Sequence, residues 1–271
     1  MSENLKCAAK EIRKLTINCI SSIGAGHIGG SMSIVDVLTA LYCSEMNIDP
    51  QDPKKEGRDR LVVSKGHAGP AVYATLAYKG YFDKDELMTL NRYGTNLPSH
   101  CDMNKTIGVD MTTGSLGQGI SCAVGMALAS KIKQDNATIY CIIGDGESQE
   151  GQVWEAAMFA SHKKLDNLIL FLDKNNLQLD GYTKDVADCG DDALKWIANG
   201  FEVYSINGND PYLCKETIKK AKASSGKPHM IILNTVKGSG VKYFEDAKEN
   251  SHSMPINEEI RVKSIAELDG E

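Results

Sequence analysis

The sequence predicts an α/β protein with a doubly wound, mostly parallel sheet flanked by helices. Short apolar segments recur along the chain, and segments with helical spacing separate them. The apolar segments do not alternate with polar residues, which indicates strands that are buried on both faces. With 271 residues, 42% of them hydrophobic, the chain can form one extensive core. We therefore expect a single domain over residues 1–271, with a C-terminal tail from about residue 240.

The first half of the chain is predicted to be mainly helical. Apolar residues such as Ile12 and Leu15 recur at helical spacing, and this pattern breaks at the segment GAGHIGG. A polar stretch, NIDPQDPKKEGRD, precedes the first apolar strand and must lie on the surface. We expect helices over residues 4–22, 33–44, 69–79 and 118–134, and one strand over residues 61–64.

The second half alternates between strands and helices. Its helices correspond to the segments EGQVWEAAMFASHKK and DDALKWIANG and to residues 211–224. Because each helix connects two buried strands, the strands are expected to run parallel. The tail after about residue 240 is predicted to contain loop and a short helix. We expect strands over residues 137–143, 167–172, 201–206 and 229–236.

Composition argues against several classes of partner and compartment. A formal charge of −6 and a pI near 5.6 argue against nucleic acid and anionic membranes, which bind basic surfaces. The lysine-rich stretch 215–227 fits a solvated helix face. Eight cysteines without CxxC or zinc-like spacing are typical of buried free thiols in a reducing compartment. The charged N-terminus lacks the apolar core of a signal peptide, and no apolar run reaches membrane-spanning length, so we expect a cytoplasmic protein.

A glycine-rich turn follows the strand predicted over residues 137–143. Its sequence is GDGESQE, and the helix after it begins at once. Glycines at 144 and 146 let the backbone approach a ligand closely. Asp145 offers a hard oxygen to a cation such as Mg²⁺, and the following helix N-terminus favours phosphate. By itself the GDG segment also fits a plain strand-to-helix turn.

A second polar segment, DKNNLQLDG, follows the strand predicted over residues 167–172. Asn175 lies one strand–helix–strand unit after Asp145. Because such a unit returns the chain beside its starting strand, both side chains could bind one ion at the carboxyl edge of the sheet. An aspartate oxygen, an amide oxygen and a backbone carbonyl suit Mg²⁺, which keeps diphosphate oxygens and water as its other ligands.

Four of the six histidines lie in loops that contain glycine, serine or proline. These loops begin or end core elements, where a ligand cleft would form. Each histidine alone also fits a structural or surface role. His162, within a helix, and His229, beside a strand start, are expected to be structural. The loop histidines are His27, His67, His100 and His252.

Together these motifs resemble the N-terminal, diphosphate-binding region of transketolase. GDGESQEGQVWEAA through DKNNLQLDG matches the thiamine-diphosphate signature, and TTGSLGQGISCAVGMA is close to a transketolase-specific stretch. GAGHIGGSMS, SKGHAG, LPSH and NSHSMP occur in the family's order, and the resemblance covers residues 10–258. It implies a thiamine-diphosphate-binding fold and two cofactors, thiamine diphosphate and Mg²⁺, for which Ca²⁺ or Mn²⁺ can substitute.

The resemblance implies a role for particular residues of this chain. Asp145, Asn175 and the carbonyl of Leu177 would bind the metal ion. His27, His100 and His252 would line the substrate channel, handle the donor's hydroxyl proton and act in catalysis. Glu150 would lie at a subunit interface that links two active sites, and would belong to the catalytic residues. The residues implied to bind the cofactor are His67, Gly114, Ser115, Leu116, Gly144, Asp145, Gly146, Glu147, Asn175 and His252.

Several positions depart from the family pattern. Ile28 and Cys101 stand where proline is common after a histidine, and Ser115 replaces the proline of TTGPLGQG. Ser253 stands where glycine is usual. These changes leave the cofactor motifs intact, but they weaken any inference about the sugar.

The chain stops where the family's first domain ends. In transketolases a second domain grips the aminopyrimidine ring and supplies a catalytic glutamate, and no second parallel α/β pattern is present here. The resemblance therefore implies a complementary C-terminal subunit with the pyrimidine-binding domain, in a two-plus-two heterotetramer that acts on sugar phosphates. A shortened piece of a longer enzyme is the rival interpretation.

The expected reaction is transfer of a two-carbon ketol unit from a ketose such as xylulose 5-phosphate to an aldose. A split 1-deoxyxylulose-5-phosphate synthase, or another ketol transferase that uses the same cofactor, is the closest alternative. A non-catalytic binding or regulatory subunit is another, although Asp145, Asn175 and the histidines are all present. A plain nucleotide-binding domain would need GxGxxG after its first strand, which is absent. The sugar pair, including a sulfonated ketose, stays open.

Overall fold

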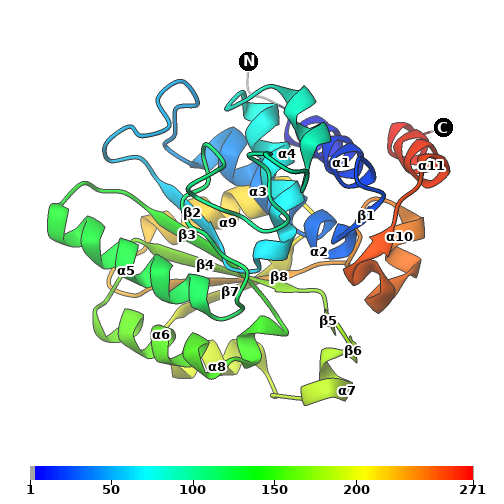
Figure 1. Cartoon of the computed structure of the whole chain (residues 1–271). Helices are drawn as coiled ribbons and strands as arrows, with labels where there is room; N and C mark the ends of the chain where they lie inside the picture. The colour runs from blue at the N-terminus through cyan, green and yellow to red at the C-terminus, as the bar shows by residue number, and fades with distance from the viewer. Residues whose placement is uncertain (1–3, 271) are drawn as a thin grey trace.

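A computed structural model describes residues 4–270 and shows a five-stranded, wholly parallel sheet between two layers of helices (Figure 1). The strand order is β2-β3-β4-β8-β7, so the strands of consecutive units β3 and β4 are neighbours. All five predicted strands and their parallel arrangement are confirmed. Their bounds are β2 Arg60–Val63, β3 Ile139–Gly144, β4 Leu168–Lys174, β7 Glu202–Asn207 and β8 His229–Asn234.

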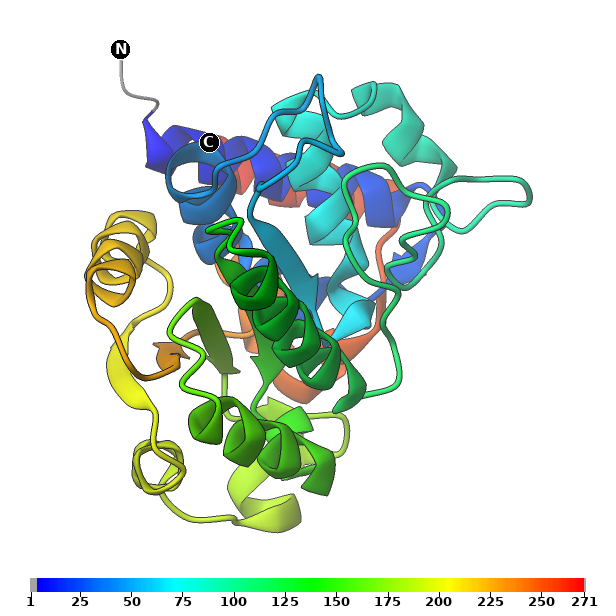
Figure 2. The same cartoon turned by 90° about the vertical axis from the view of Figure 1, so that its left-hand side faces the viewer.

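The two helical layers bury opposite faces of the sheet (Figures 1 and 2). On β4, Ile169 and Phe171 belong to one core cluster, whereas Leu170 and Leu172 belong to the other. Both faces of this central strand are therefore apolar, as the lack of alternation predicted. One layer contains α1 Leu5–Ser21, α2 Ile28–Met32, α3 Val35–Ala40, α4 Gly69–Lys79 and α9 Pro211–Ala223. The other contains α5 Gln118–Lys133, α6 Gly151–His162 and α8 Asp192–Ala198.

Local sequence explains where several helices begin and end. The Asn4 side chain accepts hydrogen bonds from the backbone N–H groups of Lys6 and Cys7 and so caps α1. Pro70 stands in the first turn of α4, where its missing N–H is not needed, and Gly80 ends this helix with φ of 85°. Asp210 caps α9 in the same way as Asn4 caps α1.

Two predicted segments differ in detail from the structure. The helix predicted over residues 33–44 is α3 followed by a π-helical turn, Leu41–Glu45. The glycine-rich segment GAGHIGG, predicted to be a break, ends in the short helix α2, to which its last three residues belong and whose residues are all buried. Burial among neighbouring elements therefore outweighs the low helix propensity of its glycines.

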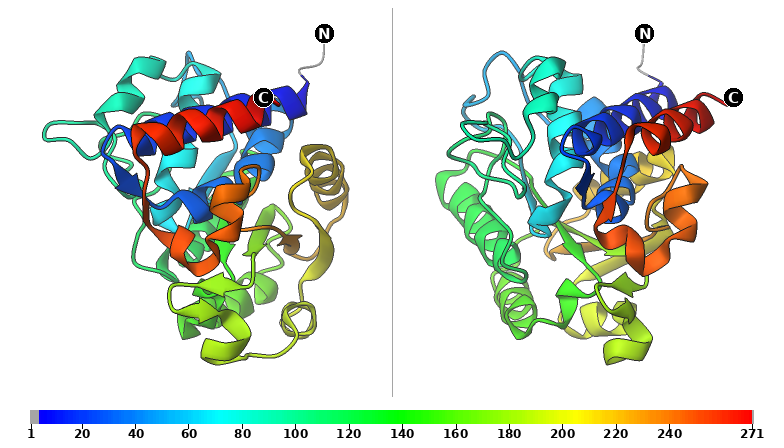
Figure 3. Two further views of the ribbon diagram at one scale, coloured as in Figure 1. Left: turned by 90° about the vertical axis from the view of Figure 1, so that its right-hand side faces the viewer. Right: turned by 45° about the vertical axis from the view of Figure 1, so that its right-hand side comes forward.

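The tail contains more helix than predicted. It includes α10 Lys242–Asp246, a 3₁₀ segment Lys248–His252 and α11 Glu258–Asp269. α11 is 12 residues long and lies beside α1 (Figure 3). Its Asp269 pairs with Lys14 of α1 at 2.6 Å, and this pair ties the two ends of the described chain together.

The remaining elements are short. Two antiparallel pairs lie outside the main sheet, namely β1 Ala25–Gly26 with β9 Met254–Pro255, and β5 Leu177–Gln178 with β6 Gly181–Tyr182. The other short helices are α7 Thr183–Ala187 and the 3₁₀ segments Gly66–Ala68, Lys84–Thr89 and Glu147–Gln149. None of the helices within residues 4–270 is long and apolar enough to cross a membrane.

The prediction of buried cysteines is right for only part of the set. Cys19, Cys101, Cys141 and Cys214 are buried. Cys122 of α5 is only half-buried. Cys7 and Cys189 are exposed.

Candidate active site

A cavity of about 390 Å³ opens at the carboxyl ends of β2, β3, β4 and β8. This is the edge where ligands bind in open parallel sheets. Loops that follow the strands form most of its wall, and α2 and the 3₁₀ segment before β9 close it. The lining residues are His27, Gly30, Lys65, His67, His100, Gly114, Leu116, Gly144, Asp145, Gly146, Glu147, Gln149, Glu150, Asp173, Asn175, Leu177, Gln178, Leu179, Lys237 and His252.

The structure brings together all but one of the residues singled out from the sequence. Ser115 is exposed and does not line the cavity, whereas its neighbours Gly114 and Leu116 do. Glu150 lies at the start of α6, is exposed and borders the cavity. His162 and His229 lie outside the cavity. His162 is exposed on α6, and His229 is buried at the start of β8.

The four loop histidines form one cluster, although they come from four separate segments. The ring centroid of His27 lies 5.4 Å from that of His67, 5.8 Å from that of His100 and 5.4 Å from that of His252. The rings of His67 and His252 are 5.1 Å apart. Gly30 makes room for this arrangement, since a Cβ there would stand 3.2 Å from His67 Nε2.

The cavity favours neutral imidazoles. Burial lowers the pKa of His27, and His100 and Lys237 add to this effect. Burial and then Lys65 hold the pKa of His67 well below its usual range. Burial and then Lys237 lower the pKa of His252 to about 4. At neutral pH these rings can therefore both accept and donate hydrogen bonds.

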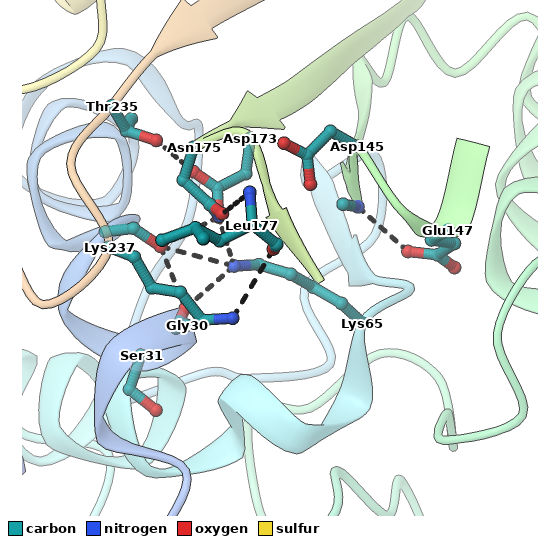
Figure 4. Close-up of polar contacts among 12 residues, drawn as sticks. Gly30, Ser31, Lys65, Asp145, Glu147, Asp173, Asn175, Leu177, Thr235 and Lys237 are labelled. Carbon is teal, nitrogen blue, oxygen red and sulfur yellow. Dashed lines mark hydrogen bonds and ion pairs between the residues drawn. The ribbon is translucent and has the colours of Figure 1, made fainter. Parts of the chain in front are cut away.

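The predicted metal ligands lie on two adjoining loops (Figure 4). Asp145 is 8% exposed, and its carboxylate accepts hydrogen bonds from the backbone N–H of Gly146 at 2.8 Å and of Asn176 at 2.5 Å. The second bond joins the loop after β3 to the loop that contains Asn175 and Leu177. The Asn175 side chain donates to Asp173 at 2.9 Å and accepts from the Leu177 N–H at 3.0 Å.

A cation would fit beside Asp145. Burial, and then the negative charge of Asp173, raise the pKa of Asp145 to about 7. Within the described chain this carboxylate forms no ion pair with a side chain, and a divalent cation would supply the missing positive charge. No cluster of three or more His, Cys, Asp or Glu suited to a metal occurs in residues 4–270. An ion bound by one carboxylate, Asn175 and the Leu177 carbonyl would therefore need further oxygens from a ligand or water.

Glu147 lines the cavity, but its carboxylate is occupied by the protein. It accepts hydrogen bonds from Ser64 Oγ, from the Gly117 N–H at 2.9 Å and from the Gly144 N–H at 3.0 Å. These donors belong to the residue after β2, to the last residue of β3 and to the residue before α5. The geometry thus assigns Glu147 to holding these segments together.

Three buried charged residues were not selected from the sequence. Lys65 and Asp173 form an ion pair of 2.6 Å, and both are almost fully buried. Lys237 Nζ lies 3.4 Å from the carbonyl oxygen of Leu177 and 3.4 Å from His252 Nδ1. Burial and then Lys65 lower the pKa of Lys237 to about 8. Only their position in the sequence could have marked these residues as candidates for the site. All three stand in or beside the segments SKGHAG, LDKNN and NTVKGSG, which lie at strand ends.

Comparisons with known proteins agree with this geometry. Residues 5–268 match the family model described as the thiamine diphosphate binding domain of transketolase. The subunit SqwG of 6-deoxy-6-sulfo-D-fructose transketolase from Clostridium sp. is 54% identical over 99% of this chain and 97% of its own length. An apulose-4-phosphate transketolase component from Actinobacillus succinogenes is 40% identical, with 99% and 97% covered. The structure of transketolase from Leishmania mexicana superposes with a TM-score of 0.92 at 31% identity, covering 99% of this chain and 42% of that one.

Proposed function

Since the chain belongs to the transketolase family, as its N-terminal thiamine-diphosphate-binding domain, we propose that it works as one subunit of a split transketolase. The reaction would transfer a two-carbon ketol unit from a ketose to an aldose. The main support is that four histidine rings and the Asp145–Asn175 loops face one cavity at the carboxyl edge of the sheet. Neither feature is needed to stabilise an α/β fold.

The diphosphate end of the cavity contains the groups that such a cofactor requires. Bound thiamine diphosphate would supply an electron sink for cleavage next to the donor carbonyl. Asp145, Asn175 and the Leu177 carbonyl would hold Mg²⁺, which would bind diphosphate oxygens at its remaining positions. Lys237, buried beside Leu177, adds a positive charge toward the same anion, and Gly146 allows its close approach.

The histidine end would handle the sugar. His27, His100 and His252 line the cavity, and the pKa values of His27 and His252 are lowered by burial. Neutral imidazoles can accept the proton of a donor hydroxyl and return it during one turnover. We propose this role for these three histidines, while His67, which is deeper and close to Lys65, packs against the cofactor.

Similar proteins suggest the class of sugar. Two of them, at 54% and 40% identity, are named for 6-deoxy-6-sulfo-D-fructose and for apulose 4-phosphate. Both sugars bear an anionic group away from the ketol unit. We propose a donor of this kind, with the sulfonated ketose as the first candidate because its relative has the higher identity and covers nearly the whole chain.

The proposal requires a partner. The similar subunits are named as parts of larger transketolases, and this chain spans 42% of the length of the Leishmania enzyme. Leu116, in the loop before α5, and Glu150, at the start of α6, are exposed and border the cavity. Farther along the same two helices, Ile132, Met158 and Phe159 are also exposed. We propose that a complementary subunit with the pyrimidine-binding domain covers this region in a two-plus-two complex. Aromatic and methionine side chains are enriched in such interfaces.

The test is purification of the tagged chain from its own host with Mg²⁺ and thiamine diphosphate. We expect a companion of similar size to co-purify, and the complex to transfer a ketol unit from 6-deoxy-6-sulfofructose to an aldose phosphate. Xylulose 5-phosphate as donor tests a general transketolase, and pyruvate tests a 1-deoxyxylulose-5-phosphate synthase. A chain that is recovered alone, binds no cofactor and is inactive with all three donors contradicts the proposal.

A further inference from the structure

A buried ion pair joins the walls of the cavity behind the proposed metal site (Figure 4). Lys65 follows β2, and Asp173 is the penultimate residue of β4. They are 2% and 0% exposed, and the Lys65 Nζ–Asp173 Oδ2 distance is 2.6 Å. Lys65 Nζ also donates to the carbonyl oxygen of Gly30 in α2 at 2.7 Å. The pair therefore connects α2 with two strand ends.

Asp173 accepts hydrogen bonds from three other side chains besides Lys65. Thr235 Oγ1 donates to Oδ1 at 2.5 Å, and Ser33 Oγ donates to Oδ2 at 2.7 Å. Asn175 Nδ2 donates to Oδ2 at 2.9 Å. One carboxylate thus ties the ends of β4 and β8 to the segment that follows α2, and the fourth bond reaches a proposed metal ligand.

The bond to Asn175 has a chemical consequence. An amide side chain offers an oxygen on one side and an NH₂ group on the other, and only the oxygen can bind a cation. Asp173 accepts but cannot donate when ionised, so it requires the NH₂ group of Asn175 on its side. The amide oxygen is thereby turned away from Asp173, toward the side of the loop where it meets the Leu177 N–H at 3.0 Å.

We infer that Lys65 and Asp173 act as a positioning pair, which fixes the Asn175 amide with its oxygen available to the metal and holds the metal loop against the rest of the cavity. This inference rests on the proposed function, because it takes Asn175 as a metal ligand. Groups behind metal ligands commonly orient them, and their loss weakens metal binding about 10- to 100-fold.

The buried position supports this role. Removing two charges from water is costly, and replacing a buried ion pair by apolar residues of similar volume is often neutral for stability. Stability alone is therefore a weak reason to bury Lys65 and Asp173 fully. Lys65 also bonds to the Gly30 carbonyl, and Asp173 to the Asn175 amide. Apolar residues could not orient these two groups.

The test uses the complex of this chain with its companion subunit, and Mn²⁺ as an EPR-visible probe in the presence of thiamine diphosphate. The double variant Lys65→Met/Asp173→Val removes both charges together. We expect Mn²⁺ affinity of the folded, assembled variant to fall about 10- to 100-fold. A double variant that binds Mn²⁺ like the wild type overturns the inference and leaves the proposed function standing.

A matched control is a second, partly buried pair near the start of β2. Arg58 bonds to Asp110, which also accepts from the Leu61 N–H at 2.9 Å. Arg58→Met/Asp110→Val is expected to lower stability and to leave Mn²⁺ affinity unchanged. Equal loss of affinity in both double variants would show a general effect of destabilisation and overturn the inference.

A second variant tests the positioning role of Asp173 if Lys65→Met/Asp173→Val does not fold. Asp173→Glu keeps the charge opposite Lys65 but moves the acceptor oxygen away from its place beside Asn175. We expect it to fold and to bind Mn²⁺ less tightly, whereas unchanged affinity would contradict positioning. A wild-type complex that shows no cofactor-dependent Mn²⁺ binding would overturn the metal site of the proposed function and this inference with it.

Discussion

Gly29 lies directly against Ser251. A Cβ at position 29 would stand 2.3 Å from Ser251 Oγ and 2.7 Å from the Ser251 carbonyl oxygen, much closer than real Cβ atoms approach. The contact joins α2 to the 3₁₀ segment that ends at His252. It thereby sets the spacing of His27 and His252, whose ring centroids are 5.4 Å apart. The absence of a side chain at position 29 is thus a condition for the histidine cluster.

Gly29→Ala should separate these two segments and destabilise the fold. Because part of the clash is with backbone, the segments themselves must move, and we expect a loss of about 1–3 kcal/mol in the free energy of unfolding. Urea titration of the purified chain measures it. Gly125→Ala on the outer side of α5 is the control, since a Cβ there meets nothing within 4 Å. That control should be neutral or stabilise by up to about 1 kcal/mol, and equal losses in both variants would contradict the steric account.

Much of the fold could be predicted because local and tertiary preferences agree. β3 is apolar up to its final glycine and β4 over its first five residues, and the polar segments after them contain the residues that meet in the cavity, Asp145 and Asn175. The adjacency of β3 and β4 was predicted from the chain returning beside its starting strand after one helix. The same rule fails for β7, because β8 lies between β4 and β7. The glycine-rich α2 was missed because its helix depends on contacts with α4 and the tail, which local propensity does not contain.

The positioning pair shows why the rest of the site was not predictable. Lys65 and Asp173 are 108 residues apart. Lys65 stands in a bend and Asp173 at the carboxyl end of β4, and polar residues are ordinary at both kinds of position. Their burial follows only once the sheet places β2, β3 and β4 side by side. Ser115 shows the opposite case, because a residue within a matching motif lies outside the cavity while its neighbours line it.

Asp145→Asn should abolish metal binding without a large loss of stability. The wild-type carboxylate is buried near the negative charge of Asp173, and the amide removes that repulsion while keeping the shape. One of the two backbone N–H groups that bond to the carboxylate then loses its acceptor, which offsets the relief of repulsion. We expect the metal-free variant to stay within about 1 kcal/mol of the wild type in urea titration, and to lose Mg²⁺-dependent retention of thiamine diphosphate in gel filtration. The control is Asp185→Asn on α7, an exposed carboxylate that should change neither property. Normal retention of the cofactor by Asp145→Asn would remove Asp145 from the metal site.

His252→Ala should slow turnover far more than it weakens cofactor binding. The ring lies in the cavity with His27 and His67, where a proton carrier contributes about 10²- to 10⁴-fold to the rate. We expect a fall of that order in kcat of the reconstituted complex, with a much smaller change in the thiamine diphosphate concentration needed for half-maximal activity. His162→Ala, on the exposed end of α6, is the control and should be fully active. Unchanged turnover in His252→Ala would sink the catalytic assignment.

Acid should destabilise the fold through the same histidines. The pKa of His252 is lowered to about 4 and that of His67 is well below its ordinary value, mainly by burial, whereas unfolded histidine titrates near pH 6.5. As pH falls from about 6.5 toward 4, these histidines bind protons in the unfolded chain but stay neutral in the folded chain. The free energy of unfolding therefore decreases. The charged and titratable groups that face His252 are Lys237, His27, His67 and Lys65, and all of them disfavour its protonation or compete for the same protons.

Replacing His67 or His252 by a residue that does not titrate should therefore reduce the change in the free energy of unfolding with pH. We expect the loss of stability between pH 7.5 and pH 5, from urea midpoints of the isolated chain, to be smaller in His67→Gln and His252→Gln than in the wild type. Protonation of carboxylates elsewhere is common to all the proteins compared and cancels in that difference. His162→Gln, which removes a ring that is exposed in the folded chain, should keep the wild-type slope. If the two cavity variants retain that slope as well, the cluster is not held neutral by burial, and acid sensitivity must come from other groups.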